Sequence, residues 1–217
     1  MIVSHSKKIV YLAPPKTGTI SVQAVLEREP FNGEVVGGHA HHDVEWSQDL
    51  ASYFHFITVR HPYSRAYSLW RTAVNHRRLF NWNPRKYSYG QPWALWFPDE
   101  APTFKELLEC SKLQLLLRRQ WRCSWHLEQI PKEIPVVVVR LENFYEDLQQ
   151  VEPLRDNLHH VVHANKNLDK SPKHWSEVVT PEHAERIREL WAEDFDRFGY
   201  NRKLEKCTSR RVSHAYF

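Results

Sequence analysis

One run of β-branched residues constrains the fold of this chain more than any other feature. Residues 134–140 read Ile-Pro-Val-Val-Val-Val-Arg. A strand of this kind has no polar face, so it must be covered on both sides, as strands of parallel sheets are. Two further apolar runs, residues 8–13 and 53–60, also predict strands, and helix-like segments alternate with them. We therefore predict an α/β fold with a central, mostly parallel sheet.

The chain has 217 residues, which suits one domain with a sizeable core. No internal repeat or low-complexity tract divides it, so we expect a single domain over residues 1–217, with its core at about 8–200 and a basic tail at 201–217. Helices are expected over about 18–29, 62–78, 104–119, 143–150 and 181–198. The last of these begins with a threonine cap and a proline. Its periodic apolar residues are expected to pack on the sheet: Ile187, Leu190, Trp191, Phe195 and Phe198.

The first predicted strand ends in a loop that suits a phosphate group. Residues 14–21, here called the lysine loop, read Pro-Pro-Lys-Thr-Gly-Thr-Ile-Ser, and an amphipathic segment follows. A strand–loop–helix of this kind gathers free N–H groups and the positive end of a helix dipole around one point. Lys16 adds a mobile charge, and Thr17, Thr19 and Ser21 add hydroxyl groups. The order differs from a Walker A loop, in which the lysine follows the glycines. A plain surface turn is the alternative.

The second predicted strand ends in an arginine-rich segment. Arg60 lies at the end of the strand, and Pro62 suits the first turn of a helix. Arg65 and Ser68 then lie three residues apart on one face of that helix. An arginine fork with a serine hydroxyl is a good receptor for a terminal phosphate. The alternative is that Arg60 only ends the strand and that Arg65 is a solvated helix charge.

Together, these segments resemble the sulfotransferases that use 3′-phosphoadenosine 5′-phosphosulfate (PAPS). The lysine loop looks like the 5′-phosphosulfate loop of that superfamily, and Arg60 with Ser68 looks like its 3′-phosphate site. Asp194-Phe195, followed by Phe198-Gly199-Tyr200, looks like the ending of the smaller, carbohydrate-type branch, sulfotransferase family 2. The resemblance runs from about residue 8 to residue 200. One departure is Ile20, where relatives usually carry a hydroxyl residue, so that one phosphate contact is missing or falls to the neighbouring serine.

The resemblance implies a P-loop-like three-layer α/β/α fold and sulfuryl transfer from PAPS to a hydroxyl or amine of a carbohydrate or small-molecule acceptor. The transfer would be in-line and metal-independent, so that the protein mainly positions groups and stabilises charge. Lys16 would lie at the bridging oxygen, where negative charge grows. The implied donor-binding residues are Lys16, Thr17, Gly18, Thr19, Ile20, Ser21, Arg60, Arg65 and Ser68.

The acceptor's proton needs a base, and a histidine is suited by a pKa of about 6.5. The resemblance implies a Gly-His pair between the first helix and the second strand, and Gly38-His39 stands there. His39 is therefore the expected base, with His41 as a second catalytic candidate and His42 expected at the acceptor. Carboxylates serve in some relatives, which keeps three in reserve: Glu34, Asp43 and Glu45. The alternative for this loop is a solvated polar turn or an incidental metal-binding cluster.

An aromatic segment at residues 80–97 is expected to form a wall or lid for the acceptor. Its flat rings, Trp93 among them, suit sugar faces or aromatic groups, and Arg85 would meet an anionic group. A satellite hydrophobic cluster under a long loop is the alternative. Residues 170–173 are expected either to close over the nucleotide or to form a solvated charged loop.

The composition bounds the partners and the compartment. A net charge of +4 fits a protein that holds an anionic nucleotide, but it is too small to indicate nucleic-acid binding. No apolar stretch reaches the roughly 18 residues of a membrane span, and the N-terminus lacks a signal-peptide pattern. The three cysteines have no metal-type spacing, so reduced thiols in a cytoplasmic protein are expected.

Two other functions stay open at this level. An ATP- and Mg²⁺-dependent P-loop kinase is disfavoured, because residues 136–144 read Val-Val-Val-Val-Arg-Leu-Glu-Asn-Phe and lack a Walker B aspartate after the strand. A non-catalytic nucleotide- or anion-binding module would fit the substitution at Ile20. Such a module would, however, be expected to have lost at least one of Lys16, Arg60 and Ser68.

Overall fold

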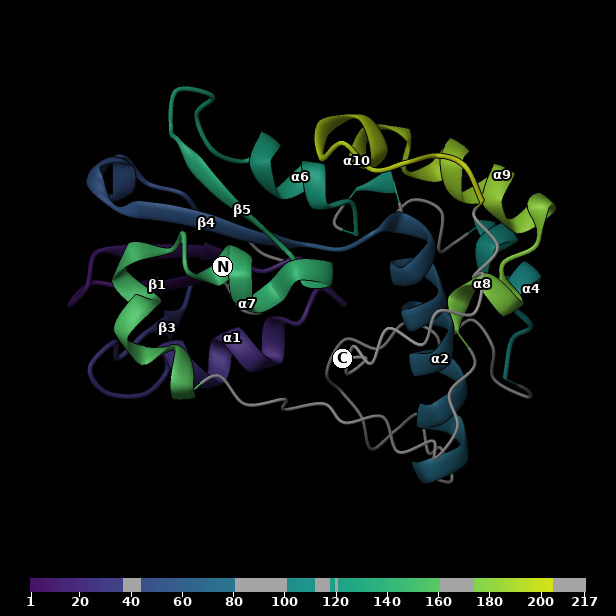
Figure 1. Ribbon diagram of the computed structural model, residues 1–217, viewed down its shortest axis with the longest axis horizontal. Helices are drawn as coiled ribbons and strands as arrows, with labels where there is room; N and C mark the ends of the chain where they lie inside the picture. The colour runs from purple at the N-terminus through teal and green to yellow at the C-terminus, as the bar shows by residue number, and fades with distance from the viewer. Residues whose placement is uncertain (37–43, 81–100, 112–117, 120, 161–173, 205–217) are drawn as a thin grey trace.

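The computed structural model describes residues 1–36, 44–80, 101–111, 118–119, 121–160 and 174–204, and these contain one five-stranded sheet (Figure 1). Its strands are β1 (Ile2–Ser4), β2 (Ile9–Leu12), β3 (Glu34–Val35), β4 (Phe54–Val59) and β5 (Val136–Arg140). The spatial order is β3-β1-β2-β4-β5. The strands β2, β4 and β5 are parallel, whereas β1 is antiparallel to both of its neighbours. The predicted α/β class and mostly parallel sheet are confirmed.

The sequence did not predict β1 or β3. The first has three residues and the second has two, which is too short for a periodic pattern to stand out. The N-terminal strand β1 is nevertheless buried along its whole length. Because β3 is antiparallel to β1, and β1 is antiparallel to β2, β3 runs in the same direction as β2. The chain therefore leaves β3 at the same edge of the sheet at which β2 ends.

Helices surround the sheet and extend beyond it. The α-helices are α1 (Thr19–Leu26), α2 (Pro62–Phe80), α4 (Phe104–Glu109), α6 (Cys123–Glu128), α7 (Phe144–Leu148), α8 (Trp175–Val178), α9 (Pro181–Leu190) and α10 (Ala192–Arg197). The 3-10 helices are η1 (Gln48–Ser52), η2 (Leu141–Asn143) and η3 (Glu152–His160). The prediction of one helix over 104–119 is wrong, because α4 ends at Glu109 and the next residue, Cys110, has a non-helical backbone with φ of −58° and ψ of 112°. Residues 112–117 lie outside the described part. No pattern in the sequence predicted α6.

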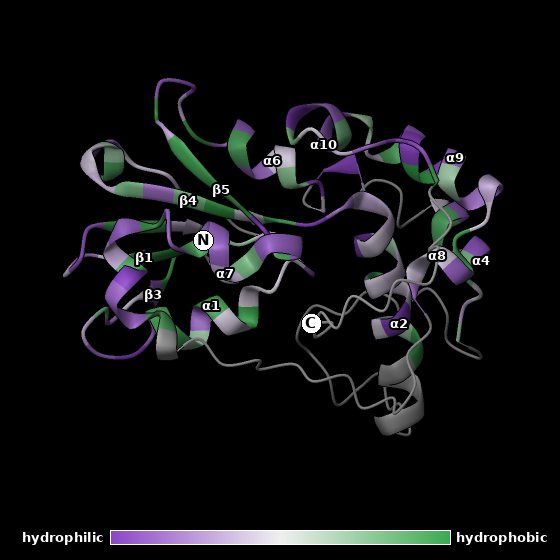
Figure 2. Cartoon of the chain, viewed as in Figure 1, coloured by the Kyte–Doolittle hydropathy of each residue, from purple (hydrophilic) through white to green (hydrophobic). Residues whose placement is uncertain are grey.

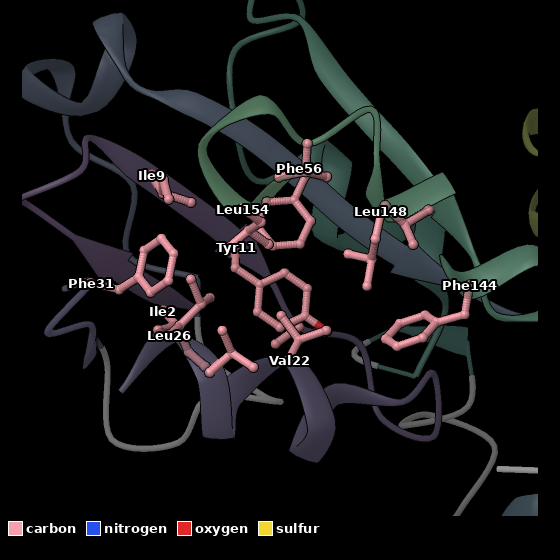
Figure 3. Packing of buried hydrophobic residues seen from close by; sticks show 14 of the residues in the cluster. Ile2, Ile9, Tyr11, Val22, Leu26, Phe31, Phe56, Phe144, Leu148 and Leu154 are labelled. Carbon is pink, nitrogen blue, oxygen red and sulfur yellow. The ribbon is translucent and has the colours of Figure 1, made fainter. Parts of the chain in front are cut away.

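The strands alternate between two hydrophobic cores, as the period of two in a pleated strand requires. Tyr11 and Phe56 face one side, where they pack with α1, α7 and η3 (Figure 3). Val10 and Ile57 face the other side, where they pack with α6 and η1. Figure 2 shows β5 in the hydrophobic colour along most of its length. The expectation that this run is covered on both sides holds only in part, because β5 is the last strand of the described sheet and only Val139 among its residues is fully buried. The sheet is thus held rigidly, which fixes the positions of the loops at its edges.

A third hydrophobic cluster lies beyond the end of the sheet and is built from α2, α4, α9 and α10. The prediction that the last helix packs on the sheet is therefore wrong for Ile187, Leu190, Trp191 and Phe195, which belong to this cluster. It is right for Phe198, which packs in the core that contains α6. Helical spacing shows which residues share a face, but it does not show which surface that face meets.

The boundaries of the C-terminal helices follow local signals. Thr180 caps α9 by accepting a hydrogen bond from the N–H of His183 at 3.3 Å, and Pro181 occupies the first turn, as predicted. The predicted single helix is broken at Trp191, which separates α9 from α10. Gly199, with φ of +66°, follows the second helix, as a helix-ending glycine does. In the described part of the chain, none of the helices has both the length and the apolar character needed to cross a bilayer.

Candidate functional site

The candidate site lies where the three parallel strands end. The lysine loop follows β2, Arg60 and α2 follow β4, and η2 follows β5. Because β2, β4 and β5 are adjacent and parallel, all three segments lie at one edge of the sheet. The crevice outside the carboxyl ends of the strands is where open α/β sheets bind ligands.

The lysine loop turns into α1 at a glycine that no other residue could replace without strain. Gly18 has φ of +84°, and a Cβ added to it would lie 2.7 Å from Cδ1 of Leu141 in η2. Its carbonyl accepts hydrogen bonds from the N–H groups of Ser21 at 3.0 Å and Val22 at 3.5 Å. The first N–H groups of a helix have no carbonyl one turn back. The amides at the start of α1 are therefore available to an anion at the positive end of the helix dipole.

Two threonine hydroxyls of the lysine loop point inward and hold its shape. Thr17 and Thr19 both donate to the carbonyl of Pro14 at 2.8 Å, and their exposed fractions are only 0% and 3%. The Thr17 hydroxyl lies 2.8 Å from that of Thr58, which in turn lies 2.6 Å from the Tyr11 hydroxyl. Because the one proton of Thr17 goes to Pro14, Thr58 donates to Thr17 and Tyr11 donates to Thr58. The loop is thus anchored to the interior of the sheet.

The other two positions of interest in the loop differ in exposure. Ile20, the residue that departs from the family pattern, is 45% exposed, whereas Ser21 is only 6% exposed. The Ile20 side chain therefore faces solvent at the first turn of α1. The Ser21 hydroxyl belongs to the packed side of the helix.

Lys16 lies close to a second positive charge, that of Arg60. It is half-buried and has a left-handed backbone, with φ of +67°. Burial, and then the positive charge of Arg60, lower the pKa of Lys16 from 10.5 to about 8. Burial also lowers the pKa of Arg60 to about 10. Burial thus destabilises both charges, and the neighbouring Arg60 further destabilises that of Lys16, so an anion bound here would stabilise them.

Arg60 lies beside two serines of α2. Its Nε donates to the Ser64 hydroxyl at 2.8 Å, and Ser64 is buried. Ser68 is half-buried one turn further along and therefore lies on the same face of the helix as Ser64. Sequence reasoning identified Arg60 and Ser68 but missed Ser64, although its spacing of four from each of them was a readable signal. Arg60, Ser64 and Ser68 form a second polar group at this edge of the sheet.

A carboxylate from the end of β5 fixes the start of α2. One oxygen of Glu142 accepts a hydrogen bond from the backbone N–H of His61 at 2.8 Å, and the other accepts from the Tyr200 hydroxyl at 3.1 Å. Burial raises the pKa of Tyr200, so its proton stays in place at ordinary pH. The His61 ring stacks on Trp175 at 5.5 Å between centroids. Sequence reasoning missed the role of Glu142, because its partners lie 81 and 58 residues away.

The comparison with known families agrees with this geometry. Residues 1–201 match the family model described as "Sulfotransferase family". The chain belongs to the sulfotransferase family. No curated protein and no solved structure gave a significant match. Membership makes the chain a transferase of sulfuryl groups, and it confirms the resemblance that the lysine loop and the Arg60 segment indicated.

In this sulfotransferase, Arg65 is placed differently from the other predicted donor residues. Its side chain is fully buried, and its Nε donates to the carbonyl of Pro15 at 2.9 Å. Its Nη1 donates to Asp194 at 3.2 Å, and the guanidinium lies 5.0 Å from the Trp191 ring centroid. A solvated helix charge is therefore excluded. The fork is used within the protein, between the lysine loop and α10.

Several predicted residues of the sulfotransferase lie outside the described part of the chain. They are His39, His41, His42, Asp43, Arg85, Trp93 and residues 170–173. Of the two remaining reserve carboxylates, Glu34 is exposed and pairs with His5 at 3.4 Å, and Glu45 is also exposed. Within the described residues, no group of three or more His, Cys, Asp or Glu side chains is placed to hold a metal ion.

Proposed function

We propose that this sulfotransferase uses PAPS and transfers its sulfuryl group to a hydroxyl or amine of a carbohydrate or small-molecule acceptor. The observation that carries the proposal is the presence of two cationic groups on different segments at one edge of the sheet. One is Lys16 with the first amides of α1, and the other is Arg60 with Ser64 and Ser68. A donor with a phosphate at each end of its ribose needs two such groups.

The protein's part in the transfer is positioning and charge stabilisation. The amides at the start of α1 hold the 5′-phosphate, and Arg60 with the two serines of α2 holds the 3′-phosphate. PAPS supplies an activated sulfuryl group, which passes to the acceptor oxygen or nitrogen as its bond to the phosphate breaks. The Lys16 ammonium lies where the leaving phosphate gains negative charge. The threonine hydroxyls keep the loop rigid, and no metal ion takes part.

We further propose that His39 accepts the acceptor's proton, with His41 as the second candidate. The direction of β3 supports this, because the chain leaves β3 at the edge where the lysine loop lies, three residues before Gly38. Glu34 is a poorer base, because its carboxylate pairs with His5. Neutral histidine suits proton abstraction near neutral pH. We assign His42, Arg85 and Trp93 to the acceptor side on the resemblance alone.

We also propose that the chain forms a single domain with a P-loop-like three-layer α/β/α arrangement. Cores on both faces of the sheet support the layers, one with α1 and α7 and the other with α6. An ATP kinase remains the second candidate among enzymes. It is disfavoured because the one acidic side chain directly after β5, that of Glu142, is occupied by the His61 amide and the Tyr200 hydroxyl. In the described part of the chain, the other carboxylate at this strand end, that of Asp147, accepts a hydrogen bond from the N–H of Arg140 at 2.8 Å, so both carboxylates are engaged within the protein.

Calorimetric titration tests the proposal. We expect adenosine 3′,5′-bisphosphate, the product of the transfer, to bind tightly with or without Mg²⁺, and ADP to bind at least about 100-fold more weakly, because it lacks the 3′-phosphate. Lys16→Ala and Arg60→Ala are expected to abolish turnover with PAPS, whereas His39→Ala is expected to spare nucleotide binding. A Mg²⁺-dependent preference for ADP would overturn the proposal in favour of a kinase. Binding of neither ligand would indicate a non-catalytic module.

A further inference from the structure

We propose that Arg65 and Asp194 are positioning residues, and that this buried ion pair holds the lysine loop in its anion-binding shape through the carbonyl of Pro15. The inference rests on the proposed function, because the same loop would bind the donor's 5′-phosphate. It assigns Arg65 to the loop that would bind the donor's 5′-phosphate, and not to the site of the 3′-phosphate.

The contacts of Arg65 connect three parts of the fold. Its Nε donates to Pro15 in the lysine loop at 2.9 Å, and its Nη1 donates to Asp194 in α10 at 3.2 Å. Asp194 also accepts from the N–H groups of Cys123 at 2.9 Å and Ser124 at 2.8 Å, the first residues of α6. The carboxylate therefore caps α6 while it orients the guanidinium. The start of one helix, the C-terminal helix and the loop are joined through two side chains.

The hydrogen bond to Pro15 fixes more than one atom of the loop. A peptide unit is planar and trans, so its N–H points away from its C=O. When the Pro15 carbonyl points to Arg65, the N–H of Lys16 must point to the opposite side. Lys16 also has φ of +67°, a conformation that a residue with a side chain adopts only when its surroundings impose it. Arg65 supplies that constraint at the peptide directly before the strained residue.

The burial of Arg65 indicates that it positions the lysine loop and does not bind the nucleotide directly. The side chains of Arg65 and Asp194 are 0% and 3% exposed. The remaining nitrogen of Arg65, Nη2, is buried too and has no hydrogen-bond partner among the described residues. The guanidinium thus presents no donor to solvent, where the nucleotide must enter. Arg60, by contrast, is half-buried at the end of β4.

The test measures what each phosphate contributes to binding in the variant Arg65→Lys. Affinities are measured for adenosine 3′,5′-bisphosphate, adenosine 3′-phosphate and adenosine 5′-phosphate. The bisphosphate's advantage over the 3′-phosphate reports the 5′ end, and its advantage over the 5′-phosphate reports the 3′ end. In Arg65→Lys we expect the 5′ contribution to fall by about 10- to 100-fold, the effect of a misplacement of about 1 Å. The 3′ contribution is expected to stay unchanged.

Two results would overturn the proposal. A fall in the 3′ contribution would make Arg65 a direct ligand of that phosphate. Unchanged contributions of both phosphates, with only a lower melting temperature, would make the ion pair purely structural. Asp194→Asn, which removes the charge and keeps an acceptor for α6, is expected to show the same pattern more weakly. Arg71→Lys is the matched control, because Arg71 lies on the same helix, is only 9% exposed and places its guanidinium over Tyr67.

A ligand-free measurement separates this proposal from the proposed function. Amide hydrogen exchange of the apo protein, followed by mass spectrometry, is compared over residues 13–22 and over residues 54–59 of β4. Arg65→Lys is expected to accelerate exchange at least about 10-fold in the first segment only, because the loop loses its anchor. If the wild-type protein did not bind the bisphosphate, the proposed function would be wrong. The exchange measurement needs no ligand, so it would still decide the role of Arg65. Equal acceleration in both segments, or none, would refute it.

Discussion

The lowered pKa of Lys16 makes donor binding depend on pH in a direction that can be worked out. Burial and the charge of Arg60 lower that pKa from 10.5 to about 8 in the free protein. A bound phosphate removes the cause by supplying a negative charge, so the pKa of Lys16 rises again in the complex. Binding must then take up a proton wherever Lys16 is neutral in the free protein, which is above a pH of about 8. Affinity therefore falls as the pH rises through this value.

The magnitude follows from the same pKa. With a pKa of about 8, roughly 10% of free Lys16 is neutral at pH 7 and roughly 90% at pH 9. The affinity for adenosine 3′,5′-bisphosphate is then expected to be about 10-fold weaker at pH 9 than at pH 7, or about 1.4 kcal/mol. Arg60, with a pKa of about 10, stays mostly charged over this range. The ligand's phosphates are already dianions, because their second pKa is about 6.

Calorimetry in two buffers of different ionisation enthalpy measures this uptake directly. We expect about 0.9 proton to be taken up at pH 9 and about 0.1 at pH 7. Lys16→Arg should abolish the pH dependence, because arginine stays charged throughout. The free energy of unfolding of the free protein should change with pH in the opposite direction. The unfolded chain binds more protons above pH 8, so wild-type stability relative to Lys16→Met is expected to rise from pH 8 to pH 10. A wild-type affinity that stays constant from pH 7 to pH 9 would refute this reasoning.

Three substitutions test other parts of the account. Gly18→Ala should lower both the melting temperature and the bisphosphate affinity, because its Cβ would lie 2.7 Å from Leu141. In the control Gly199→Ala, the new Cβ has nothing within 4 Å, so the free energy of unfolding should fall only by the backbone strain of about 1–2 kcal/mol. Arg60→Gln should abolish the higher affinity, measured by titration, of the bisphosphate over adenosine 5′-phosphate. If this difference in affinity stayed the same, Arg60 would not bind the 3′-phosphate. Tyr11→Phe should lower the free energy of unfolding by about 1 kcal/mol in urea, because one buried hydrogen bond is lost while the ring remains; an unchanged free energy would contradict the inferred hydroxyl chain.

The parts of the fold that the sequence predicts are those with local causes. The valine run of β5 has no polar side chain, and the lysine loop has a glycine at the more strongly positive of its two positive φ angles. The threonine and proline at the start of α9 and Gly199 after α10 are local stop and start signals. Each of these depends on neighbours within about one turn of chain, so reading them needs no tertiary information.

The parts that the sequence could not predict depend on partners far along the chain. Arg65 shares a helix face with Ser68, and the pattern alone gives no reason to bury a charged residue. Its partner, Asp194, lies 129 residues away in a helix of its own. The helix that Asp194 caps, α6, has only six residues and no periodic pattern. Thr17 and Thr19 were expected to face a ligand, but a hydroxyl that can reach a carbonyl in its own loop is satisfied there first.

Phosphorus NMR of bound adenosine 3′,5′-bisphosphate tests the central claim most directly, because each phosphate gives its own resonance. We expect Lys16→Ala to shift the bound 5′ resonance and to leave the 3′ resonance in place, and Arg60→Ala to do the reverse. This result would place the two ends of the donor at the two cationic groups of the sheet edge. If both substitutions moved the same resonance, or if neither moved any, the two groups would not bind opposite ends of one nucleotide, and the account would be contradicted.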